Sequence, residues 1–209
     1  MSPERISLYA LWALGLVNLG LTVRLVAWAR TTTREVQARE VWSPELEIGQ
    51  QAPTFRARTL DGKRVTERSY SGRAVAYVFL SPNCDGCRAT FPQLQAFYPA
   101  AKAQGTEIVV VTDTGVKQTT NWLETFRVAG TQVVTPIVVA PIRESNFVST
   151  YNGPSFFPYY CFVNADGIVA VRGIIGKEPW IALTEMWAGR GEGPIRLPRV
   201  GEPVFDDAR

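Results

Sequence analysis

The chain has 209 residues, of which 46% are hydrophobic and six are tryptophan, and this is enough apolar material for the core of one ordinary domain. The formal net charge of +3 is small, and the arginines are scattered rather than gathered with aromatic residues along one stripe. These properties argue against a nucleic-acid-binding protein, so we expect no nucleic-acid partner.

The first predicted element is a membrane anchor in residues 1–30. Ile6 to Val23 are 18 residues without a charge, and an apolar run resumes after Arg24, so the segment is long enough to span a bilayer. Arg24 can snorkel toward the headgroups, and Trp28 suits the interfacial belt. A cleaved signal peptide and a buried core helix are the alternatives, but the residues after the span match a cleavage site poorly. We therefore expect one uncleaved transmembrane helix.

The segment after the anchor leads into a single folded domain. Residues 31–47 are polar and charged, which predicts a juxtamembrane tether ahead of a domain in residues 48–188. Phe55–Leu60 and Lys63–Thr66 flank an Asp-Gly pair, and this pattern predicts a β-hairpin. The apolar run Ala74–Leu80 then predicts the central strand.

The rest of the domain alternates between helix and strand patterns. Asp85 to Gln104 carries apolar residues at helical spacing, and Pro92 predicts a kink in that helix. The later predicted elements are a buried strand over Thr106–Thr112, a helix over Val116–Val128, a short strand over Val133–Val139, a weak helical turn over Arg143–Tyr151, a hairpin of Tyr160–Val163 and Ile168–Val171 with its turn at Asn164–Gly167, and a closing helix over Pro179–Trp187. This order predicts the α/β class, with a mixed sheet covered by helices on both faces. Residues 189–209 are rich in Gly, Pro and charge and predict a disordered tail.

The motif Cys84-Asp85-Gly86-Cys87 lies where the central strand ends and the predicted helix begins. Two intervening residues let the sulfurs close a small disulfide, and the free N–H groups of the first helical turn stabilise a thiolate on Cys84. We therefore predict that Cys84 attacks a substrate disulfide and that Cys87 resolves the mixed disulfide that forms.

Structural explanations of this cysteine pair compete with redox chemistry. Structural zinc normally takes four Cys or His ligands, whereas the chain has three cysteines and no histidine, so we expect neither a metal nor a cofactor. A static disulfide would suit an exported domain, but closing so small a loop adds little stability through chain entropy. The third cysteine, Cys161, lies in an apolar strand pattern and is predicted to be part of the core.

Four features of the sequence, one of which contains this motif, form a recognisable set. They are Ile48–Phe55 with Thr59–Gly62, the loop Ser81–Cys87, Pro92 placed five residues after the second cysteine, and Phe157–Gly167. Together they resemble the thioredoxin-like redoxins, in particular the membrane-anchored disulfide reductases of the TlpA and MauD kind, over about Ile48 to Trp187. The resemblance implies a thioredoxin-like mixed sheet flanked by helices.

The same resemblance implies a role for Phe157 and Pro158. Pro158 would follow a cis peptide bond and face the dithiol, and the backbone of Phe157 would present an edge to a substrate strand while the proline keeps metal ions from the sulfurs. An ordinary proline at the start of a strand is the alternative.

The chain also departs from the family pattern. Asn83 replaces the tryptophan common before the first cysteine in thioredoxins, and the central strand has no acidic residue to accept a proton from Cys87. Asp85 lies between the sulfurs, where its charge should oppose a neighbouring thiolate. Ser81 and Tyr77 do not fit the peroxiredoxin pattern, so peroxidase activity is not expected.

Two functions are consistent with these features. The leading hypothesis is a membrane-tethered thiol-disulfide oxidoreductase that reduces or exchanges protein disulfides and receives electrons from a membrane protein. The alternative is a non-catalytic accessory or assembly subunit of a membrane complex, which the missing acidic residue and the aromatic loop Tyr151–Phe157 favour.

Charge and chemistry predict opposite orientations for the domain. One arginine precedes the predicted span and four follow it within a short distance, so the positive-inside rule places the main domain in the cytoplasm. A tethered dithiol finds more disulfide substrates in an oxidising compartment, because disulfides form and persist there. We expect a single-pass cell-membrane protein whose main domain faces the extracytoplasmic, periplasmic side.

Overall fold

The computed structural model describes residues 12, 15–22, 24 and 46–190, and it divides into two compact units, residues 1–42 and 43–209. In the first unit, residues 15–22 are helical. Among the residues described, we find no helix with the length and apolar character that a bilayer crossing requires. Most of the predicted anchor, nearly all of the tether and the tail beyond residue 190 lie outside the described residues, so the predicted division of the chain stays a prediction.

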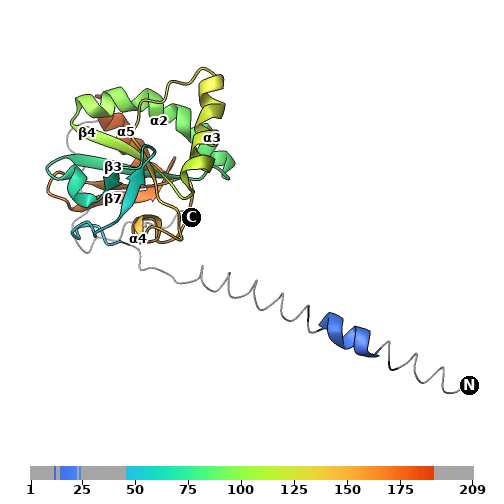
Figure 1. The fold of residues 1–209 in the computed structure, drawn as a ribbon. Coiled ribbons are helices and arrows are strands. Elements are labelled where there is room, and N and C mark those ends of the chain that lie inside the picture. The colour runs from blue at the N-terminus through green and yellow to red at the C-terminus, as the bar shows by residue number, and fades with distance from the viewer. Residues whose placement is uncertain (1–11, 13–14, 23, 25–45, 191–209) are drawn as a thin grey trace, which may run out of the picture. The chain divides into compact units, whose positions relative to one another are not determined.

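Seven strands in the described part of the second unit form one mixed sheet with the order β2-β1-β5-β4-β3-β6-β7 (Figure 1). β4 pairs in parallel with β3 and β5, and the other neighbours are antiparallel. The central strand β3 therefore lies between β4 and β6. The candidate active site follows directly after its carboxyl end. The bounds are β1 Ala57–Thr59, β2 Arg64–Val65, β3 Ala74–Leu80, β4 Thr106–Thr112, β5 Ile137–Val139, β6 Tyr159–Val163 and β7 Val169–Ile174.

Helices cover both faces of this sheet (Figure 1). Side chains of α2 (Asp85–Ala103), α3 (Val116–Val128) and α5 (Glu178–Trp187) pack in one core cluster, and those of α4 (Phe147–Tyr151) pack in the other. A short 3₁₀ helix, η1 (Glu67–Tyr70), precedes β3.

β3 supplies both clusters, because successive strand residues point to opposite faces. Ala76, Val78 and Leu80 join the α2 side, and the residues between them join the α4 side. Burying each large apolar side chain stabilises the fold by roughly 1.5–3 kcal/mol.

The predicted elements agree with the structure at most positions. The first hairpin, β3, β4, α3, the second hairpin and α5 are confirmed, and α2 continues through Pro92 and Pro99. The predicted strand over Val133–Val139 was wrong in extent, because β5 begins only at Ile137.

The shorter β5 has a local cause. The backbone N–H groups of Val134 and Thr135 donate to Gln95 Oε1 of α2 at 2.8 and 3.1 Å. Pro136 has no N–H group to offer a neighbouring strand. The predicted helical turn over Arg143–Tyr151 is likewise shorter, since only Phe147–Tyr151 is helical.

Candidate active site

The two cysteines of the motif lie at the junction between β3 and α2. Cys84 is the N-cap residue of α2, and its sulfur accepts a hydrogen bond from the backbone N–H of Cys87 at 3.2 Å. The N-terminus of a helix favours negative charge, because its first N–H groups have no helical partner. Both cysteines are free thiols, so the structure places the predicted nucleophile and resolving thiol side by side in the reduced state.

The two thiols differ in exposure. Cys84 is partly exposed, whereas Cys87 has 0% of its surface exposed. Burial is the main cause that raises the pKa of Cys87, and the hydrogen bond with Cys84 raises it further. The backbone N–H of Ser81, which donates to Cys87 Sγ at 3.4 Å, acts in the opposite direction. A substrate disulfide can therefore reach Cys84 but not Cys87.

Phe157 and Pro158 lie beside the dithiol. The peptide bond between them is cis, as predicted. The thiol of Cys84 donates to the carbonyl oxygen of Phe157 at 3.5 Å. A Cβ atom on Gly86 would lie 3.4 Å from Pro158 Cδ and 3.9 Å from Cys84 Sγ, so the first turn of α2 approaches the proline closely. The structure thus brings the predicted catalytic and substrate-binding residues into one site.

Asn152 also shapes this site, although the sequence analysis did not select it. Its side chain is fully buried, its amide donates to Phe156 O at 2.7 Å, and its carbonyl accepts from Phe156 N at 3.2 Å. The two bonds hold the backbone one residue before Phe157. Asn side chains often hydrogen-bond to nearby backbone in turns, and this preference is the sequence signal that could have pointed to Asn152.

A second residue that the sequence analysis missed is Asp113, which directly follows β4. Leu80 pairs with Thr112 in parallel register, so Ser81 and Asp113 leave the sheet as neighbours. Burial raises the pKa of Asp113, and the Ser81 side chain, a hydrogen-bonding group beside the carboxyl, lowers it. The charge of Asp113 in turn contributes to the raised pKa of Cys87. The central strand lacks an acidic residue, but its parallel neighbour supplies one.

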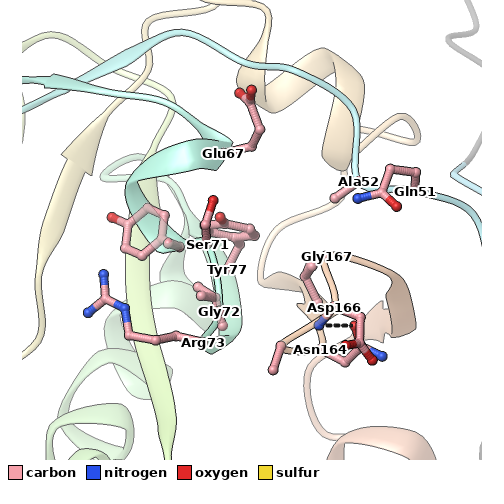
Figure 2. A pocket seen from close by; sticks show the side chains of 14 residues that line it. Gln51, Ala52, Glu67, Ser71, Gly72, Arg73, Tyr77, Asn164, Asp166 and Gly167 are labelled. Atoms are coloured by element: carbon pink, nitrogen blue, oxygen red, sulfur yellow. Dashed lines mark hydrogen bonds between the residues drawn. The ribbon is translucent and has the colours of Figure 1, made fainter.

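A pocket of about 140 Å³ lies at the amino-terminal end of β3, away from the dithiol. Figure 2 shows the side chains that line it. Glu67, Arg73 and Tyr77 line it on one side, and the turn at residues 164–167 lines it on the other. Within that turn the N–H of Asp166 donates to Asn164 Oδ1 at 3.0 Å. The pocket contains neither sulfur of the dithiol, so we assign it no part in the chemistry of the site.

Cys161 is completely buried in β6, which confirms the predicted core position. It belongs to the cluster on the α4 side of the sheet, whereas Cys87 belongs to the cluster on the α2 side. Burial raises the pKa of its thiol to about 12. A buried thiol on the other face of the sheet is separated from the dithiol chemistry.

We expect Cys161→Ser to lower stability without lowering activity. A serine hydroxyl in this apolar surrounding costs about 1–3 kcal/mol of unfolding free energy. Thermal unfolding and insulin-reduction rates at 25 °C would measure the two properties, with Cys161→Ala as the variant that adds no polar group. A loss of turnover at unchanged stability would show that Cys161 takes part in redox chemistry.

Comparison with known proteins agrees with this geometry. The AhpC/TSA family matches residues 48–170. The thiol-disulfide oxidoreductase ResA of Bacillus thuringiensis (strain Al Hakam) is 29% identical over 139 residues, which cover 64% of this chain and 73% of that protein. The ResA of Bacillus anthracis matches with the same identity and coverage.

Solved structures support the same fold. The thioredoxin domain of a thiol-disulfide oxidoreductase from Bacteroides vulgatus superposes with a TM-score of 0.55 at 20% identity, covering 68% of this chain and 99% of that one. A thiol:disulfide interchange protein from Bacteroides sp. gives 0.54 at 20% identity, covering 69% and 92%. The fold is thioredoxin-like, the relatives and the fold identify an oxidoreductase, and the chain belongs to the AhpC/TSA family.

Proposed function

We propose that the protein is a membrane-tethered enzyme that reduces or exchanges protein disulfides through Cys84 and Cys87, of the TlpA and MauD kind. The observation that carries the proposal is the pair of thiols at the N-terminus of α2, of which one is accessible and the other buried. Cys84 attacks a substrate disulfide, and Cys87 then attacks Cys84 to release the reduced substrate. A membrane protein returns electrons to the oxidised pair.

The surface beside Cys84 supports a protein as the substrate. Phe156 directly precedes the Phe157 carbonyl that meets the Cys84 thiol, and 54% of its surface is exposed. Ile174, which pairs with Tyr159 in the sheet, is 39% exposed. An extended peptide bound at this edge would find apolar contacts close to the reactive sulfur.

Turnover of insulin disulfides by the full chain in detergent tests the proposal. With a thiol reductant present, we expect the wild type to precipitate insulin B chains well above the rate of the reductant alone. A variant with both Cys84 and Cys87 replaced by serine is the blank. Equal rates for wild type and blank would favour the non-catalytic accessory subunit.

We also propose that residues 1–30 anchor the protein and that the folded domain faces the periplasmic side. The uncharged run from Ile6 to Val23 and the presence of a dithiol support this placement. Protease added to intact spheroplasts should therefore degrade the domain. Protection in spheroplasts, with degradation only after lysis, would place the domain in the cytoplasm and contradict both the location and the proposed substrates.

A further inference from the structure

The neighbourhood of the resolving cysteine contains a carboxyl group with an unusual environment. The Oδ1 atom of Asp113 is buried, and among the described residues it has no hydrogen-bond partner. Burying an unpartnered carboxyl oxygen costs free energy, so such a group is uncommon outside functional sites. The threonine hydroxyls nearby bond one another, Thr119 to Thr112 at 2.8 Å and to Thr114 at 3.1 Å, and the Ser81 side chain, whose hydrogen bond lowers the pKa of the carboxyl, leaves Oδ1 without a partner.

Ser81 connects this carboxyl to Cys87. The parallel register of β3 and β4 sets Ser81 next to Asp113, and Ser81 is itself buried. The backbone N–H of Ser81 donates to Cys87 Sγ at 3.4 Å. The carboxyl group and the buried sulfur therefore lie on either side of one residue.

We propose that Asp113 accepts the proton of the Cys87 thiol in the resolving step, across the intervening residue Ser81. This inference rests on the proposed function of the dithiol. A buried thiol cannot become a nucleophile unless some group takes its proton, and bulk water does not reach Cys87.

In the mixed disulfide, Cys84 Sγ is bonded to a substrate sulfur. Cys87 loses its proton to the Asp113 carboxylate, and the Cys87 thiolate then attacks Cys84 Sγ. The Cys84–Cys87 bond forms, the bond from Cys84 to the substrate breaks, and the departing substrate thiolate takes a proton. The substrate disulfide is reduced by two electrons, and the protein dithiol is oxidised to a disulfide.

The other titratable groups around Cys87 do not fit this role. Cys84 is engaged in the mixed disulfide at that moment. Asp85 and Arg88 of α2 are exposed to solvent. Tyr160 of β6 shares the core cluster with Cys87, but burial raises the pKa of its phenol, so it stays neutral.

The test separates the two thiol reactions in time. The full chain in detergent is mixed with an aromatic disulfide whose released thiolate absorbs visible light. The first release reports attack by Cys84, and the second reports attack by Cys87 on the mixed disulfide. We expect Asp113→Asn to slow the second release roughly 10- to 100-fold and to change the first less than about twofold. Asp166→Asn, the same change at an exposed turn, should alter neither release.

The pH dependence adds a readout that a merely structural role would not move. A carboxyl accepts a proton only when it is ionised, so the second release of the wild type should rise along a titration step as the pH increases through the Asp113 pKa. The first release should lack this step, and Asp113→Asn should abolish it. This wild-type profile remains decisive if the variant does not fold.

Three results would overturn the assignment. They are a second release without the titration step in the wild type, an unchanged second release in Asp113→Asn, and equal slowing of both releases in that variant. The proposed function fails separately: insulin turnover at background, together with a selectively slowed second release in Asp113→Asn, would contradict the substrate class and leave the role of Asp113 intact.

Discussion

A Cys87→Ser variant is expected to accumulate mixed disulfides between Cys84 and substrate proteins, whereas Cys84→Ser should accumulate none. The exposed sulfur at the N-cap of α2 remains able to attack when Cys87 is replaced, but the second attack cannot follow. Both variants should lose insulin turnover by about 100-fold or more, because each removes one of the two sulfurs that the cycle needs.

Trapping with the full chain expressed in cells measures this difference. Free thiols are blocked with an alkylating agent, and disulfide-linked adducts are separated on non-reducing gels and released by a reductant. Cys161→Ser is a suitable control, since it also replaces one cysteine but leaves both reactive sulfurs in place. Adducts on Cys84→Ser and none on Cys87→Ser would reverse the assigned roles of the two thiols.

The dithiol and the fold around it could be predicted from sequence because their signals are local. An apolar run, a Cys-x-x-Cys motif and a helical pattern follow one another within the 31 residues from Ala74 to Gln104. Hydrophobic periodicity reports on such local order directly. The structure agrees to within one residue for β3 and α2.

The parts that could not be predicted depend on which strands become neighbours. Asp113 is 26 residues from Cys87 in the chain, and only the parallel pairing of β3 with β4 sets it next to Ser81. The late start of β5 has a similar origin, since Gln95 of α2 binds the backbone N–H groups that the pattern alone would give to a strand. Contacts between residues far apart in the chain produce no hydrophobic periodicity, so the sequence pattern does not predict them.

The position of Phe157 relative to Cys84 also depends on the side chain of Asn152, five residues earlier in the chain. The Phe157 carbonyl meets the Cys84 thiol, and the preceding residue is held by Asn152 through both its N–H and its C=O groups. Ser155, within the same loop, has a φ of 54°, so the segment follows a tight path before it reaches the site. Asn152 therefore holds the loop that carries Phe157 to the dithiol.

We expect Asn152→Ala to lower stability by about 1–3 kcal/mol, because it leaves two backbone groups of Phe156 without a partner. It should also lower insulin turnover roughly tenfold, since a protein substrate must dock against the edge that Phe156 and Phe157 form. The reaction of Cys84 with a small aromatic disulfide should change less than about twofold, because a small molecule does not need that edge.

Asn146→Ala is the matched control for this prediction. Asn146 also makes two side-chain bonds to backbone, donating to Thr54 O at 3.1 Å and accepting from Arg56 N at 3.2 Å, but neither partner belongs to the site. Its replacement should reduce stability and leave the ratio of insulin turnover to small-disulfide reaction unchanged. If both variants leave that ratio unchanged, the Phe157 edge does not bind protein substrates, and recognition must then depend on a surface beyond the loop that Asn152 holds.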